Sequence, residues 1–153
     1  MRTDNRLSRM LHVLIHMSSH TGAATSETIA RMLSTNPVVV RRTMAGLREA
    51  GYVRSAKGHN GGWELARPLE EITMADIYRA LGSPHLFALG LANDDPRCLV
   101  EKSVNARIHD TLGAAEAMIL EQFAAMTLAQ VRDDFEDRLA RTSHQCGHPH
   151  AGD

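Results

Sequence analysis

Residues 57–62 have the sequence Lys-Gly-His-Asn-Gly-Gly, a composition typical of the tip of a β-hairpin. Three glycines and an asparagine tolerate the positive φ angles that tight hairpin loops require. The flanking segments, 52–56 and 63–66, alternate apolar and polar residues as short strands do. Pro68 then ends the second strand, so the sequence predicts a small two-stranded wing.

Two short helices are expected just before this wing. Thr25 is a candidate N-cap for the first helix, and residues 34–36 form a turn after it. The second helix begins at Pro37 behind Asn36 as its cap, and Gly51 ends it. A short helix, a three-residue turn, a second helix and a glycine-tipped hairpin follow one another in the order of a winged helix-turn-helix.

A long helix is expected in the second half of the chain, because apolar residues recur at steps of three and four from Leu99 to Met126. The predicted fold class is therefore mainly α with a small β-wing. Residues 1–82 form the winged helix-turn-helix domain, 83–98 a loop, 99–141 the long helix and a final helix over 128–140, and 142–153 a flexible tail. The apolar stripe is too long for the small domain to cover, so we expect a homodimer with contacts at Val104, Ile108, Leu112, Ile119 and Phe123.

Charge is distributed unevenly along the chain. Residues 1–67 hold 10 of the 17 Lys and Arg residues but 4 of the 18 Asp and Glu residues, although the net charge of the chain is −1. A basic half joined to an acidic half is typical of a unit that binds a polyanion. Two differently solvated faces would give the same pattern, so charge alone leaves both interpretations open.

The sequence contains no signal for a membrane or for export. It has no run of eighteen apolar residues, and its N-terminus lacks an apolar stretch followed by a cleavage site. Two cysteines among 153 residues do not make a disulfide framework. We therefore expect a cytoplasmic protein.

Candidate DNA contacts lie on the outward positions of the second helix and on the wing. The arginine fork can pair with guanine or with phosphate, and valine offers apolar surface to thymine methyl groups. A lysine at the hairpin tip is placed to reach a minor groove or a phosphate. The candidates are Val38, Val39, Arg41, Arg42, Arg54, Lys57, His59 and Asn60. Each arginine singly would also fit a solvated surface charge.

The run Gly51–Pro68, followed by Glu71–Ile77, resembles the wing and the next helix of the Rrf-two (Rrf2) family of winged-helix transcription regulators. The resemblance covers roughly residues 5–140. It implies a dimer whose long helix packs on its mate, double-stranded operator DNA as the partner, and regulation of a small set of genes. Trp63 stands where the family usually has tyrosine, and we interpret it as a core residue under the wing.

Many members of that family hold an iron–sulfur cluster on three cysteines in the loop before the long helix. Cys98 is the only cysteine in this region, so no cofactor is expected. Cys98 remains a candidate redox thiol near a helix N-terminus, with Cys146 as a possible disulfide partner. An inert thiol is the alternative. A second alternative is an iron–sulfur cluster or a metal ion held by Cys98 with His12 or His109. His12 lies on an apolar helix, however, and is expected in the protein core. The tail, with Cys146, His148 and His150, is either solvated or metal-binding.

No motif points to an enzyme, since the glycines at 58–62 lack the strand-to-helix setting of a phosphate loop. The main hypothesis is a homodimeric, sequence-specific transcription regulator, a repressor, responsive to redox through Cys98. A winged-helix module that binds protein instead of DNA is the competing hypothesis, and a thiol-dependent redox enzyme using Cys98 is a third. The effector or partner protein is left open.

Overall fold

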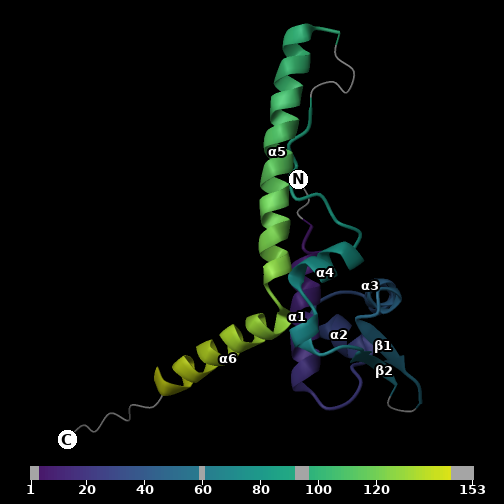
Figure 1. Cartoon of the computed structure of the whole chain (residues 1–153). Coiled ribbons are helices and arrows are strands. Elements are labelled where there is room, and N and C mark those ends of the chain that lie inside the picture. The colour runs from purple at the N-terminus through teal and green to yellow at the C-terminus, as the bar shows by residue number, and fades with distance from the viewer. Residues whose placement is uncertain (1–3, 59–60, 92–96, 146–153) are drawn as a thin grey trace, which may run out of the picture.

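The computed structural model of the chain describes residues 4–58, 61–91 and 97–145, and it is mainly helical with one small sheet (Figure 1). Its α-helices are α1 (Arg6–Ser19), α2 (Ser26–Met32), α3 (Pro37–Glu49), α4 (Met74–Ala80), α5 (Leu99–Ala125) and α6 (Leu128–Gln145). A 3-10 helix, η1, spans Leu69–Glu71, and strands β1 (Val53–Ala56) and β2 (Gly62–Leu65) pair antiparallel. This element order confirms the predicted winged helix-turn-helix followed by a long helix.

The helix ends of the helix-turn-helix are set by local side chains, as predicted. The Thr25 hydroxyl accepts a hydrogen bond from the Thr28 backbone N–H at 3.1 Å at the start of α2. The Asn36 side chain accepts one from the Val38 N–H at 2.8 Å at the start of α3. Gly51 follows α3 with a φ of +80°, a conformation that costs glycine little.

The core of the winged-helix domain lies between α1, α2, α3 and the wing. Trp63 of β2 is 9% exposed, and its indole N–H donates to the Ser26 hydroxyl at 3.0 Å. Two backbone hydrogen bonds of 2.9 Å also join Trp63 to Ala24, so β2 is tied to the segment that leads into α2. The interpretation of Trp63 as a core residue is confirmed. The inward residues of the helices are Met10, Val13, Leu14, Met17, Ile29, Val40, Met44 and Leu47.

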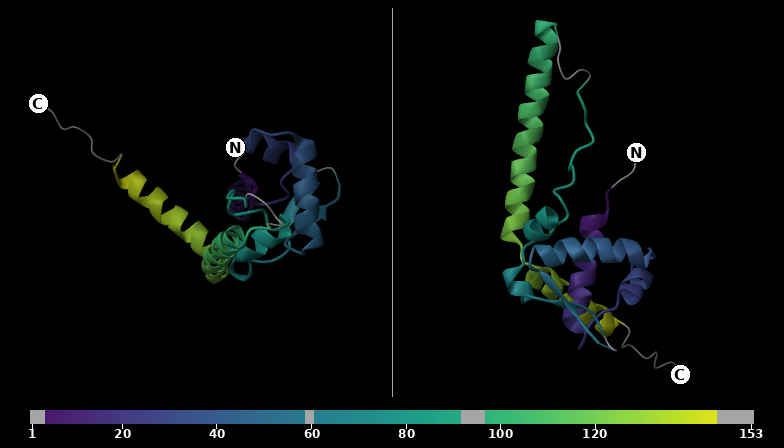
Figure 2. Two further views of the ribbon diagram at one scale, coloured as in Figure 1. Left: turned by 90° about the horizontal axis from the view of Figure 1, so that it is seen from above. Right: turned by 90° about the vertical axis from the view of Figure 1, so that its right-hand side faces the viewer.

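The two C-terminal helices leave this domain in different directions. Figures 1 and 2 show α5 as a long column rising from the domain and α6 departing from its lower end at a sharp angle. Residues 83–91 form neither helix nor strand and run beside α5 toward its N-terminal end. None of the helices in the described ranges is both long and apolar enough to cross a membrane.

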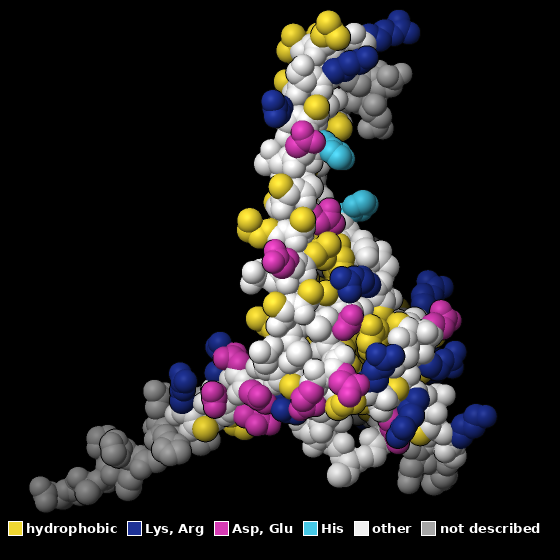
Figure 3. All heavy atoms as spheres, in the orientation of Figure 1, with side chains coloured by type: hydrophobic (Ala, Val, Ile, Leu, Met, Phe, Trp, Pro, Cys, Tyr) yellow, Lys and Arg dark blue, Asp and Glu magenta, His cyan; other side chains and the backbone are white. Residues whose placement is uncertain are grey.

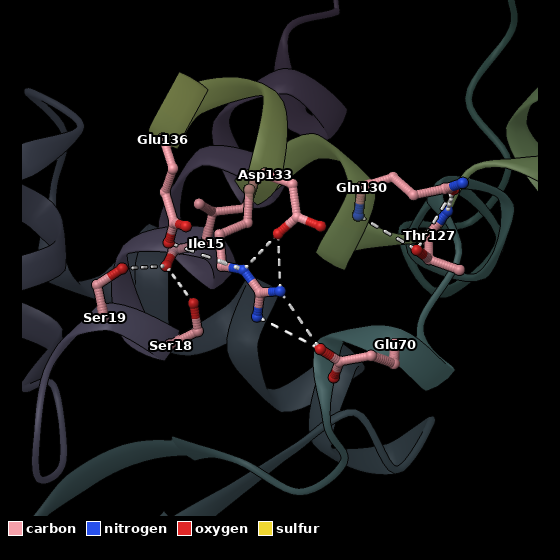
Figure 4. A network of polar contacts seen from close by, with 9 residues as sticks. Ile15, Ser18, Ser19, Glu70, Thr127, Gln130, Asp133 and Glu136 are labelled. Carbon is pink, nitrogen blue, oxygen red and sulfur yellow. Dashed lines mark hydrogen bonds and ion pairs between the residues drawn. The ribbon is translucent and has the colours of Figure 1, made fainter. Parts of the chain in front are cut away.

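The junction between α5 and α6 is docked onto the domain. The Leu128 N–H donates to the Ile72 carbonyl at 2.8 Å, and the Met74 N–H donates to the Met126 carbonyl at 3.0 Å. The Leu128 side chain is fully buried. Arg132 of α6 then forms an ion pair with Glu70 at 3.4 Å. Figure 4 shows Glu70 of η1 near the start of α6, where Thr127 and Gln130 form the capping box. The capping box agrees with the sequence, whereas the docking is a tertiary feature.

The final helix is longer than expected. It ends at Gln145 instead of near residue 140, so the expected flexible tail from residue 142 overlaps its last turn. The physical reason is that no glycine or proline interrupts the chain between Leu128 and Gly147, and nothing local ends the helix earlier. The tail residues Cys146, His148 and His150 lie outside the described residues, as do His59 and Asn60 of the wing.

Candidate nucleic-acid interface

The second helix of the helix-turn-helix, α3, divides its residues between core and surface. Val40, Met44 and Leu47 are buried, as their three- and four-residue spacing requires. On the opposite side Val38 is 62% exposed and Val39 is 53% exposed. Apolar side chains that stay exposed at the start of a helix provide a surface for contact with another molecule.

Two arginines of α1 hold the helix-turn-helix in place. The Arg9 guanidinium donates a hydrogen bond to the Leu33 carbonyl, which caps the C-terminal end of α2. The Arg6 guanidinium donates to the Leu81 carbonyl at 3.4 Å, at the end of α4, while it is also paired with Asp4. These contacts link α1 to the C-terminal ends of α2 and α4, the two helices that contact α3.

Arg41 is exposed on α3, but its guanidinium is already paired. Its Nη2 atom lies 2.8 Å from Oε1 of Glu27, in the first turn of α2. The pKa of Glu27 is lowered, first by a hydrogen bond from its own backbone N–H and then by Arg41. Both side chains remain more than half exposed, so the pair is open to solvent.

Arg42, the next residue, makes no ion pair with any residue of the described ranges. It lines a groove of about 440 Å³ between α3 and the end of α4. Arg42 therefore offers a free cationic fork beside apolar surface. The lining residues include Val38, Val39, Thr43 and Leu81.

The wing repeats this arrangement of one paired and one unpaired cation. Arg54 faces Glu64 across the two strands, and their side chains form an ion pair at 3.0 Å. Lys57, at the end of β1, is exposed and is unpaired within the part of the chain that the structure describes. A Cβ at Gly61 would lie 2.7 Å from the Ala56 carbonyl, so the hairpin closes this tightly only with glycine there.

The charge asymmetry of the sequence corresponds to a spatial separation. On the face shown in Figure 3, Lys and Arg side chains gather over the winged-helix domain, and Asp and Glu side chains gather over α6 and its junction with the domain. Among the described residues, those on α6 include Asp133, Asp134, Glu136 and Asp137. One group of basic side chains on this face therefore lies over the winged-helix domain, while others lie toward the far end of α5 and on α6.

The long helix α5 has no fully buried residue in the chain as described. Phe123 contacts the Tyr78 ring, with centroids 6.3 Å apart, where α5 meets α4. Ile108, Leu112 and Ile119 are half-buried, whereas Val104 is exposed. At the far end Leu99 is 78% exposed and Val100 is 70% exposed, and they line an open apolar hollow with Val104 and Ile108.

Cys98 occupies the N-cap position of α5 and is an exposed free thiol. Hydrogen bonds from the backbone N–H groups of Glu101 and Val100 lower the pKa of this thiol, because they stabilise the thiolate. This agrees in direction with the expected effect of a helix terminus.

The histidines considered as metal ligands lie on the surface. His109 of α5 is exposed, with Nδ1 3.9 Å from Oδ1 of Asp110. His12 is also exposed, so the expectation that it packs in the core is wrong. The reason is that Met10, Val13, Leu14 and Met17 already fill the inward face of α1 and turn His12 outward. Within the described ranges, no three His, Cys, Asp or Glu side chains are grouped to hold a metal ion.

The comparison with known families decides the classification of this winged-helix chain. A family model described as "Rrf2: Iron-dependent Transcriptional regulator" matches residues 3–134. The chain belongs to the Rrf2 family of transcriptional regulators. Members of this family are DNA-binding regulators rather than enzymes, which confirms the main class of function expected from the sequence.

Individual Rrf2 relatives agree in length and fold. The chain is 31% identical over 131 residues to the HTH-type transcriptional regulator YwnA of Bacillus subtilis, covering 84% of this chain and 95% of that protein. A transcriptional regulator from Lactobacillus plantarum has a TM-score of 0.73 at 20% identity, covering 92% of this chain and 96% of that one. T. potens IscR has a TM-score of 0.59 at 24% identity, with 90% of each chain covered. At these identities the two structures support the fold alone.

The sequence analysis did not identify the two carboxylates that pair with candidate DNA-contacting arginines, Glu27 and Glu64. Glu64 could have been found, because the hairpin register places it opposite Arg54. Glu27 lies fourteen positions before Arg41 and on another helix, so no periodic pattern links them. The sequence did identify Arg41, Arg42, Arg54 and Lys57, which the structure places on α3 and the wing.

Proposed function

We propose that this Rrf2-family regulator binds a double-stranded operator as a homodimer and represses transcription there. In each protomer α3 would lie in the major groove and the wing would contact the flanking backbone. The observation that supports this best is the combination of exposed Val38 and Val39 with the unpaired Arg42 at the N-terminal half of α3. Apolar surface beside a free guanidinium suits thymine methyl groups and guanine edges.

The exposed cations divide the proposed contacts into two kinds. Arg42 reads bases, so its loss should relax specificity at one position at a cost of about 1–3 kcal/mol. Lys57 contacts phosphate, so its loss should weaken binding to all DNA sequences by a similar factor and make the affinity less dependent on salt concentration. Arg54 would approach the phosphate backbone while paired with Glu64. Arg41 would contact a second base while paired with Glu27, which holds one edge of its guanidinium.

The experiment is selection of binding sites from random duplex DNA, followed by titration at several salt concentrations. The variants are Arg42→Ala and Lys57→Ala. Arg48→Ala is the matched control, because Arg48 is an exposed arginine in the last turn of the same helix. Equal effects of Arg42→Ala and Arg48→Ala would contradict this placement of α3, and failure to select any sequence would favour a protein-binding module.

The dimer would form through the apolar face of α5, which the winged-helix domain leaves uncovered. Pairing of two such faces would also space the two α3 helices by about 34 Å, one turn of DNA, or by a multiple of it. Ile108→Asp with Leu112→Asp should give monomers or unfolded protein with little operator affinity. Ala106→Asp with Ala117→Asp, both exposed on the other side of α5, should sediment as the parent does. A folded monomer that binds its operator normally would exclude this dimer.

Cys98 is proposed as the redox-responsive residue, since its pKa is lowered and its thiol is exposed next to the loop before α5. No cofactor is proposed, because the chain has two cysteines and lacks the three-cysteine motif of many relatives. Operator titration with reduced and peroxide-treated protein tests this. Cys98→Ser should abolish the redox response, and Cys146→Ser should abolish it only if a disulfide forms. A full response in Cys98→Ser would make the thiol structural.

A further inference from the structure

Three histidines lie near one another on α1 and just after its C-terminal end. The three follow one another at steps of four residues, which places His12 and His16 one above the other on the helix, whereas His20 lies just beyond its end. The rings of His12 and His16 meet edge to face, with centroids 4.6 Å apart and planes at 63°. The rings of His16 and His20 are stacked with centroids 6.4 Å apart.

The surroundings of His16 favour the neutral form of its ring. His16 is half-buried, and its pKa is lowered first by burial and then by repulsion from His12 and His20. A neutral imidazole has a free nitrogen lone pair, which is the form that binds a metal ion. No hydrogen bond joins these three rings to other side chains within the described ranges, so their nitrogens do not have to break one to coordinate.

We propose that His12 and His16 form a surface site for one divalent transition-metal ion of the Cu²⁺, Ni²⁺ and Zn²⁺ class. Two histidines four residues apart on a helix are a recurrent pair of metal ligands, because both rings reach the same point in space. Metal–nitrogen distances are about 2.0–2.1 Å, and rings already in contact need only rotate to meet one ion. This inference does not depend on the proposed DNA binding.

The chemistry of the donors selects the class of ion. Imidazole is a good ligand for Cu²⁺, Ni²⁺ and Zn²⁺, whereas Mg²⁺ and Ca²⁺ prefer oxygen ligands. Affinity should follow the general order for nitrogen sites, with Cu²⁺ bound most tightly. No third ligand side chain completes the site within the described part of the chain, so the remaining positions take water or an outside donor. The site is therefore an open, exchangeable one.

His20 is excluded as the partner of His16 by the backbone. It follows the last residue of α1 and has an extended conformation, with φ of −108° and ψ of 139°. Its ring lies nearly parallel to that of His16 with centroids 6.4 Å apart, compared with 4.6 Å for His12 and His16, so His12 is the nearer partner. A site formed by His12 and His16 would be weakened by substitution of His12 but not of His20. A site formed by His16 and His20 would give the opposite result.

The test is calorimetric titration of the reduced protein with NiCl₂ or ZnCl₂. A second measurement adds CuSO₄ and records the electron paramagnetic resonance spectrum of the bound copper. His12→Asn and His16→Asn should each weaken one saturable site by about tenfold or more, since a lone imidazole loses the benefit of its tethered neighbour. His20→Asn is the matched control and should bind as the parent does. All three side chains are at least partly exposed, and circular dichroism verifies that each variant is folded.

A double variant, His148→Asn with His150→Asn, separates this site from the histidines of the C-terminal tail. It should retain the saturable site, and the copper spectrum should keep the coupling pattern of two nitrogens. Loss of the site in the tail variant would overturn the proposal. So would loss in His20→Asn with retention in His12→Asn, or absence of any saturable binding by the parent.

Discussion

The guanidinium of Arg41 on α3 lies 2.8 Å from the carboxylate of Glu27 in the first turn of α2. This ion pair bridges the two helices of the helix-turn-helix on their solvent-exposed side. One edge of the guanidinium is used by Glu27, so the other edge is left to face a partner. An exposed pair of this kind adds little to stability, and its consequence is for the orientation of Arg41.

Glu27→Gln is therefore expected to change DNA discrimination more than folding. Loss of a negative charge near DNA should strengthen non-specific binding, while an unrestrained Arg41 should discriminate less between the selected operator and a version altered at the base it reads. Discrimination should fall by up to about tenfold, which is within the range of a single bidentate contact. Glu64→Gln removes the same charge from the wing and is the control. Equal loss of discrimination in both variants would contradict an orienting role for Glu27.

Trp63→Phe should destabilise the domain by about 1 kcal/mol beyond the change in side-chain size. The substitution removes the indole N–H that donates to Ser26 at 3.0 Å and leaves the buried hydroxyl without that partner. Urea unfolding followed by circular dichroism measures the change. Ser26→Ala should lower the free energy of unfolding less in the Trp63→Phe background than in the parent, because the two residues share one interaction. Strict additivity would show that the hydrogen bond is not important.

Gly62→Ala should loosen the attachment of β2 to the start of α2. A Cβ at this position would lie 2.6 Å from the Ala24 carbonyl oxygen, so backbone must move, at a cost of about 1–3 kcal/mol. Gly113→Ala on α5 is the contrasting control, since no atom lies within 4 Å of its added Cβ. It should stabilise the helix by about 1 kcal/mol. Thermal unfolding compares them, and a neutral Gly62→Ala would contradict the close approach.

Asp76→Asn should remove part of the acid dependence of folding. Burial raises the pKa of Asp76, but hydrogen bonds from Thr73 and Tyr52 and the charge of Arg79 outweigh it, so the pKa is lowered. The stabilisation by this carboxylate is therefore complete above about pH 4, the ordinary value, and is lost as pH falls through the lower folded-state pKa. Urea midpoints are measured from about pH 2.5 to about pH 6. They should differ between parent and variant at the upper end of this range and become equal at its acid end. Parallel curves would contradict the prediction.

The local features of the fold were predictable because each depends on neighbouring residues. Asn36 and Pro37 begin α3, Gly51 ends it, and the Gly61 N–H donates to the Gly58 carbonyl at the hairpin. All three features involve contacts within a few positions. The capping box of Thr127 and Gln130 belongs to the same class. The end of α6 was not predictable in this way, since no local signal marks Gln145.

The position of a side chain on an apolar helix was predicted less well. His12 of α1 was expected in the protein core, yet it is exposed. A helix can bury only one stripe of side chains, and four apolar residues already occupy that stripe of α1. The four-residue spacing of His12, His16 and His20 was visible in the sequence, but contact between the rings depends on rotamers that the spacing leaves open.

The sequence by itself determined the order of elements, the cationic residues of α3 and the wing, and the apolar stripe of α5, because caps, turn residues and periodicity act over short distances. Only the tertiary structure decided which cations are paired. Glu27 reaches Arg41 because α2 packs on α3, while Arg42 one position later turns toward α4 and stays unpaired within the described residues. Likewise, the docking of Leu128 on Ile72 requires segments more than fifty residues apart to meet. Such contacts depend on how whole helices pack, and no local pattern in the chain encodes that arrangement.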